Sequence, residues 1–131
     1  MVVGSNMELE YQNSNRENVM TEKNKVALVV GAGDAIGSAI VKKFARQGLV
    51  TIGVRRNGDK LIPVVEELAK EGHTAYGWSF DARSEDATVE LFERIERDIG
   101  ELDTVVFNVG ANVPMSVLDT TERKFRKIWE M

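Results

Sequence analysis

Hydrophobic positions switch repeatedly along this chain between short continuous runs and helical repeats. Residues 26–30 form an uninterrupted apolar run, which is typical of a parallel strand covered on both faces. A glycine turn follows, and apolar side chains then recur at helical spacing as far as Gly48, a typical helix stop: Ile36, Ile40, Val41 and Phe44. These residues predict a first strand, turn and helix.

The same alternation continues through the middle of the chain. Residues 50–54 predict a second strand, and residues 59–70 predict a helix with Leu61, Val64, Val65 and Leu68 on one face. A third strand is expected over 75–80. Ser84 then caps a third helix, which we expect to bury Val89, Phe92, Ile95 and Ile99.

A fourth strand and helix complete the pattern. Residues 102–107 predict the strand, and Asp119-x-x-Glu122 resembles a capping box that opens a helix containing Phe125, Ile128 and Trp129. Alternating strands and helices favour an α/β fold, a Rossmann-type doubly wound parallel sheet. With about four strands, that sheet is incomplete and has the order 3-2-1-4.

The first 24 residues differ from the rest of the chain. They are rich in Asn, Glu and Ser and show no helical or strand period, so they bury too little apolar surface to offset the entropy of ordering. We therefore predict a disordered tail over 1–24 and a partial dinucleotide-binding domain over 25–131.

Composition excludes several kinds of function. The 17 Lys and Arg residues against 21 Asp and Glu give a net charge of −4, which argues against a general nucleic-acid or anionic-membrane surface. The chain has no Cys and one His, His73, so thiol chemistry and a His-rich zinc site are excluded and no metal is expected. No apolar run approaches the roughly 18 residues of a membrane-spanning helix, and we predict a cytoplasmic protein.

The glycine turn is the segment with the clearest candidate chemistry. It reads VGAGDAIG over residues 30–37 and lies between the first strand and the first helix. Glycines let a backbone turn sharply and bring its N–H groups close to a pyrophosphate at the helix N-terminus. A tight structural joint is the alternative interpretation, whereas a P-loop is excluded because no Gly-Lys-Ser/Thr follows.

Two arginines stand where a dinucleotide's ribose would be selected. The residue that contacts the ribose is expected at the end of the second strand, about 20 residues after the turn. An acid there favours NAD, and an arginine accommodates the 2′-phosphate of NADP. The chain has Arg55 and Arg56 there, and no acid before Asp59. These residues predict NADP rather than NAD, unless both arginines are simply solvated.

Three segments in order resemble one enzyme family. The run ALVVGAGDAIGSAIVKKFARQG, the later FDA at Asp81, and VVFNVGAN at Asn108 are similar to the N-terminal half of the short-chain dehydrogenase/reductase family over about residues 25–131. The resemblance implies that the TGxxxGIG loop cradles the pyrophosphate, Asp81 lies near the adenine, and Asn108 of the NNAG motif steadies the sheet. The expected cofactor-binding residues are Gly31, Gly33, Asp34, Ala35, Ile36, Gly37, Arg55, Arg56, Asp81, Ala82, Asn108 and Gly110.

The sequence departs from this family pattern at the turn and after the fourth strand. Val30 replaces the usual Thr, Ala35 replaces the middle Gly, and NNAG becomes NVGA over residues 108–111. The family's catalytic Ser and YxxxK are also missing, because neither Tyr11 nor Tyr76 has Lys four residues later.

The resemblance therefore implies an NADP-preferring oxidoreductase that transfers hydride between nicotinamide and a carbonyl or alcohol, and a 131-residue chain that is inactive alone. It also allows a homo-oligomer. Two alternatives remain: a non-catalytic nucleotide-binding or regulatory module, and an interaction subunit that completes its sheet on another chain.

Overall fold

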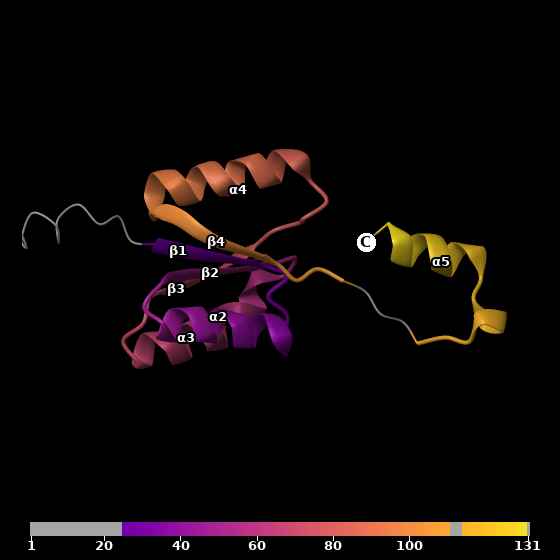
Figure 1. The fold of residues 1–131 in the computed structure, drawn as a ribbon, viewed down its shortest axis with the longest axis horizontal. Helices are drawn as coiled ribbons and strands as arrows, with labels where there is room; N and C mark the ends of the chain where they lie inside the picture. The colour runs from indigo at the N-terminus through magenta and orange to yellow at the C-terminus, as the bar shows by residue number, and fades with distance from the viewer. Residues whose placement is uncertain (1–24, 111–113, 131) are drawn as a thin grey trace, which may run out of the picture.

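The computed structural model describes residues 25–110 and 114–130, so the tail predicted over 1–24 lies outside the described residues. The elements follow the expected alternation (Figure 1) and are, in order, β1 (Lys25–Val30), α2 (Ile36–Arg46), β2 (Val50–Arg55), η1 (Gly58–Leu61), α3 (Ile62–Lys70), β3 (Ala75–Ser79), α4 (Glu85–Asp98), β4 (Glu101–Phe107), η2 (Val117–Asp119) and α5 (Glu122–Trp129). The predicted bounds are close, except that the helix expected from Asp59 begins as the 3₁₀ turn η1.

The four strands form one parallel sheet in the order β3-β2-β1-β4. This confirms the predicted Rossmann-type topology. Strand β1 is central and pairs with β2 so that Val30 faces Val54, while on its other side Val30 faces Phe107 of β4. All four carboxyl ends therefore meet at one edge of the sheet, where a doubly wound fold places its ligands.

Two hydrophobic cores explain why β1 is apolar throughout. On one face, α4 covers Val26, Leu28 and Val30, and on the other face α2 and α3 cover the side containing Val29. Figure 1 shows this layering, with α4 on one side of the sheet and α2 and α3 on the other. Each successive β1 residue thus enters an opposite core, as strand geometry requires.

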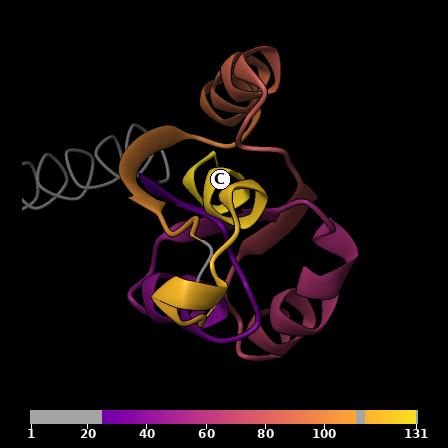
Figure 2. The same cartoon turned by 90° about the vertical axis from the view of Figure 1, so that its right-hand side faces the viewer.

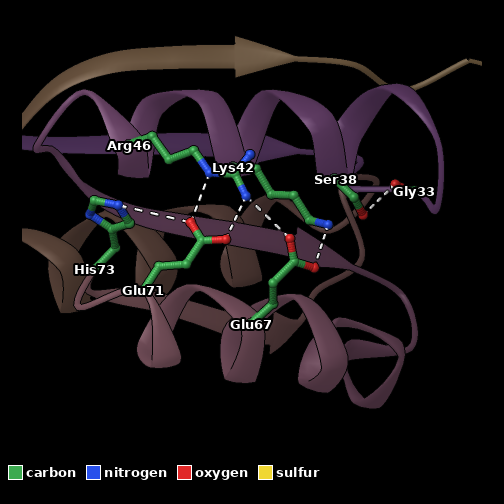
Figure 3. A network of polar contacts seen from close by, with 7 residues as sticks. All are labelled: Gly33, Ser38, Lys42, Arg46, Glu67, Glu71 and His73. Carbon is green, nitrogen blue, oxygen red and sulfur yellow. Dashed lines mark hydrogen bonds and ion pairs between the residues drawn. The ribbon is translucent and has the colours of Figure 1, made fainter.

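Helices α2 and α3 are joined by ion pairs on their outer side (Figure 3). Lys42 Nζ lies 2.6 Å from Glu67 Oε2, and Arg46 Nη2 lies 2.7 Å from Glu71 Oε1. His73 Nε2 is 4.0 Å from Glu71 Oε2, just before β3 begins. Since that is the amino end of the strand, His73 lies at the edge of the sheet opposite the carboxyl ends.

One sequence prediction about a helix face is wrong in part, and one about a cap is wrong. In α4, Ile95 is buried as expected and Ile99 packs half-buried against the same core, but Leu91 is buried in place of Val89 and Phe92, which are 54% and 36% exposed. Asp119 does not cap α5, because it ends η2 and Thr121 is the N-cap, with its hydroxyl accepting from Lys124 N. Local sequence fixes neither the buried face of α4 nor the cap of α5. The buried face of α4 is the one that packs against the sheet.

Helix α5 and the turn η2 before it lie beyond the carboxyl edge of the sheet, apart from the sheet and the helices that cover it (Figure 1), and Figure 2 shows the molecule from that side. None of its residues is buried, and Phe125 stacks on Trp129 with ring centroids 6.3 Å apart. In residues 25–110 and 114–130, no helix is long and apolar enough to cross a membrane.

Candidate dinucleotide-binding cleft

A cleft of about 690 Å³ opens at the carboxyl edge of the sheet. Its walls come from the ends of β1 and β2, from the residues that directly follow β3 and β4, from the glycine turn and from the start of α2. All twelve cofactor-binding residues expected from the sequence line it: Gly31, Gly33, Asp34, Ala35, Ile36, Gly37, Arg55, Arg56, Asp81, Ala82, Asn108 and Gly110. Residues from four separate segments therefore meet at one place.

The glycine turn is held against its neighbouring strands by backbone contacts. Gly31 has φ +82°, a conformation that favours glycine, and its N–H donates to Val54 O at 2.9 Å. A Cβ atom on Gly31 would lie 2.4 Å from Asn108 O. This position therefore needs glycine for its conformation and for the close approach of β4.

Asn108 connects the end of β4 to the same turn. Its backbone N–H donates to Val30 O at 2.7 Å, and its side-chain amide donates to Gly31 O at 3.1 Å. The side chain therefore holds the turn rather than pointing freely into the cleft. The resemblance implied that Asn108 steadies the sheet, and that role stays a prediction.

Beyond Gly31 the turn is open toward the cleft. A Cβ on Gly33 would meet no other heavy atom within 4 Å. Helix α2 starts after Ala35 with no side-chain cap and no acid in its first turn, so the first N–H groups of the helix have no side-chain acceptor. Such an end attracts anions.

The departures from the family turn fit this geometry. Ala35 has φ −102°, so the residue replacing the middle glycine carries its methyl group without a left-handed conformation. Val30 is 5% exposed and belongs to the core beneath α4. Ile36, one of the expected cofactor-binding residues, is 67% exposed and lines the cleft.

Basic side chains dominate the charge of the cleft. Four cationic residues line it against two acids, Asp34 and Asp81. Arg55 donates to Asp34 Oδ1, and Arg83 donates to both carboxylate oxygens of Asp81. The Arg83 side chain and backbone N–H lower the pKa of Asp81 to about 2, so its carboxylate is charged at neutral pH.

Sequence reasoning missed three polar residues of this cleft, Asn57, Lys60 and Arg83, along with the apolar lining residues Val30, Val54, Phe80 and Val109. Arg83 is two residues after Asp81, and that short spacing was a usable signal. Lys60 reaches the cleft because Asn57 caps η1, its side chain accepting from Asp59 N at 3.1 Å. The sequence predicted one continuous helix over 59–70, and that prediction did not include the 3₁₀ turn η1.

The fold is Rossmann-type with a cleft at the carboxyl edge of its sheet, and comparison with known proteins identifies the family. The family model described as short chain dehydrogenase matches residues 25–131, and the chain belongs to that family. An NADP-dependent (R)-specific alcohol dehydrogenase of Lentilactobacillus kefiri is 37% identical over 109 residues, which cover 81% of this chain and 42% of that enzyme.

Solved structures agree with this family. A short-chain dehydrogenase from Rhodopseudomonas palustris is 44% identical with a TM-score of 0.73, matching 82% of this chain and 50% of that one. An actinorhodin polyketide ketoreductase solved with NADPH is 26% identical with a TM-score of 0.72, matching 82% of this chain and 41% of the other. The chain thus spans half or less of the length of these relatives.

Proposed function

We propose that this chain is the cofactor-binding part of an NADP-preferring short-chain oxidoreductase. The reaction is hydride transfer between a nicotinamide and a small carbonyl or alcohol. The observation that carries the proposal is that an open glycine turn, an uncapped helix start and a basic rim of Arg55, Arg56 and Lys60 meet in the same cleft. The named activities of the alcohol dehydrogenase and of the ketoreductase with NADPH support the same chemistry.

The pyrophosphate would lie over Gly33 at the start of α2. No side chain fills that space, and the first-turn N–H groups with the positive end of the helix dipole would hold the anion. The adenine would lie toward Asp81 and Ala82, and Asn108 would keep the turn in place by its bond to Gly31 O.

The 2′-phosphate would lie against the basic rim formed by Arg55, Arg56 and Lys60. Among the described residues, Arg56 makes no ion pair within 4.0 Å, so its guanidinium is available to a phosphate. A charge-assisted hydrogen bond contributes on the order of 1.5 to 3 kcal/mol. That is enough for a clear preference over NADH.

Bound NADP(H) would supply or accept the hydride, and the residues of this chain would bind and orient it. The family's YxxxK proton donor does not occur in the 131 residues, so turnover is assigned to residues that this sequence does not contain. The inactivity of the chain alone, a homo-oligomer and a cytoplasmic location also remain predictions.

The proposal is tested by thermal-shift titration with NADPH and NADH. We expect NADPH to raise the melting temperature of the wild-type chain more than NADH does. Arg56→Gln should remove most of that difference, whereas Arg97→Gln, on the outer face of α4 and paired with Asp98, should leave it intact. Equal shifts by both cofactors in the wild type would show that NADP is not preferred, and no shift by either would exclude dinucleotide binding.

One observation favours a second function, an interaction subunit. Strand β4 pairs with β1 alone among the described strands, and its side chains Val105 and Phe107 are 47% and 67% exposed. An open apolar edge favours pairing with further polypeptide. In that case the chain would bind a partner whether or not NADPH is present.

A further inference from the structure

We propose that Asp34 is a specificity-determining residue at the ribose end of the cleft. Its carboxylate pairs with Arg55 across the mouth of the cleft, so a 2′-phosphate must compete with Asp34 for that guanidinium. The pair thereby reduces the preference for NADP that the basic rim alone would give. This inference rests on the function proposed above and concerns the same site.

The geometry ties the end of β2 to the glycine turn. Arg55 Nη1 donates to Asp34 Oδ1, and the same nitrogen lies 3.5 Å from the backbone oxygen of Ala32. Both charged residues line the cleft. Because the two contacts hold the guanidinium toward the turn, Arg55 is engaged where a ribose substituent would need it.

Exposure shows which partner is fixed. The Arg55 side chain is 19% exposed, whereas that of Asp34 is 75% exposed. The arginine is therefore seated in the protein and the aspartate approaches it from the solvent side. Replacing Asp34 should change the charge at the mouth without disturbing the core.

Asp34 carries its charge throughout the neutral range. The hydrogen bond and charge of Arg55, with a further contribution from Lys60, hold the pKa of Asp34 below its usual value. A phosphate placed at Arg55 would therefore lie beside a full negative charge. A ribose 2′-hydroxyl in that place is neutral and could donate to the same carboxylate.

These opposite effects give a direct test with adenosine 2′,5′-bisphosphate and 5′-AMP. Both contain the adenosine end of a dinucleotide, and they differ by the 2′-phosphate alone. Each is titrated calorimetrically into the full 131-residue chain at constant ionic strength. We expect Asp34→Asn to bind the bisphosphate about two- to fivefold more tightly, with 5′-AMP unchanged or weaker, because the site is partly exposed and its charges are screened.

Asp59→Asn is the matched control. It makes the same change in net charge and lies in the nearby turn η1, but Asp59 does not line the cleft. We expect its ratio of bisphosphate to 5′-AMP affinity to equal that of the wild type. A gain as large as that of Asp34→Asn would mean that overall charge is responsible and would overturn the inference.

A double-mutant cycle tests whether Asp34 acts through Arg55. In an Arg55→Gln background, Asp34→Asn should lose most of its effect on bisphosphate binding. If Asp34→Asn tightened bisphosphate binding just as much in the Arg55→Gln background, Asp34 would not act by competing for Arg55, and the inference would be overturned. If the wild type prefers the bisphosphate and Asp34→Asn leaves the ratio of bisphosphate to 5′-AMP affinity unchanged, this inference is overturned and the proposed function stands. If the wild type binds neither probe and does not bind NADPH, both are overturned.

Discussion

Gly31 and Gly33 are two residues apart in one turn, yet the structure places different demands on them. Gly31 combines φ +82° with a space closed by Asn108 O, whereas a Cβ on Gly33 would meet nothing within 4 Å. The first glycine is required by the fold. The second leaves room above the turn, where the pyrophosphate is proposed to lie.

Gly31→Ala should therefore lower the free energy of unfolding by about 2 to 4 kcal/mol, from the left-handed backbone and the contact with Asn108 O. Gly33→Ala should change it by less than about 1 kcal/mol and weaken NADPH binding instead. Urea denaturation and the NADPH thermal shift separate the two effects. Equal stability losses in both variants would contradict this division.

Asp81 offers a test of the electrostatics at the adenine end. The Arg83 side chain and backbone N–H lower its pKa from 3.8 to about 2. A depressed folded-state pKa means that the stabilisation is present above pH 3.8 and is lost as pH falls through about 2. An NMR titration of the Asp81 carboxyl carbon should give a midpoint near 2, and Arg83→Gln should return it toward 3.8. A midpoint near 3.8 in the wild type would show that the pair does not form.

At the scale of elements, α4 and α5 have the same kind of cap but differ in how they are packed. Ser84 accepts from Ala87 N at 3.2 Å, and Thr121 accepts from Lys124 N at 3.4 Å. Helix α4 buries Leu91 and Ile95, whereas α5 buries no residue. A cap contributes to global stability only if its helix forms together with the core.

Ser84→Ala should accordingly lower global stability by about 1 kcal/mol, and Thr121→Ala should leave it unchanged. Urea denaturation followed by circular dichroism measures both variants under the same conditions. A comparable loss in Thr121→Ala would mean that α5 packs on the domain in solution.

At the scale of the whole molecule, the sheet is covered at its centre and open at β4. Val105, Phe107 and Val109 are 47%, 67% and 37% exposed. We expect the 131-residue chain to self-associate as its concentration rises, because this apolar edge has no covering layer among the described residues.

The double variant Val105→Lys and Phe107→Lys should weaken that association in sedimentation equilibrium. Ile62→Lys changes another exposed apolar residue, 52% exposed on α3, and should have little effect. A wild-type chain that stays monomeric at every concentration tested would contradict the role assigned to the edge.

Much of the fold and of the cleft's position follows from local sequence signals. The continuous run of β1 requires a strand with a core on each face, and the glycines before α2 require a sharp turn at its carboxyl end. Right-handed parallel crossovers together with the doubly wound pattern then predict the order 3-2-1-4. The glycine turn and Arg55 were expected at that edge from the sequence pattern, the family resemblance added Asp81 and Asn108, and all four residues line the cleft.

The buried face of α4 shows where local spacing is insufficient. Val89, Phe92, Ile95 and Ile99 satisfy a helical repeat, and so does the stripe through Leu91 and Ile95 that the structure buries. The two stripes share residues and lie side by side on the helix. Only the position of the helix on the sheet selects between them.

What the sequence by itself determined, then, is the order of elements, the parallel sheet and the edge where the cleft lies, because apolar periodicity and backbone freedom act between near neighbours. The tertiary structure alone decided which charged and polar groups meet there. Arg55 pairs with Asp34, Lys60 turns into the cleft, and Asn108 reaches Gly31 across 77 positions. Such contacts depend on how separate strands and turns are juxtaposed, and no spacing within one segment encodes them.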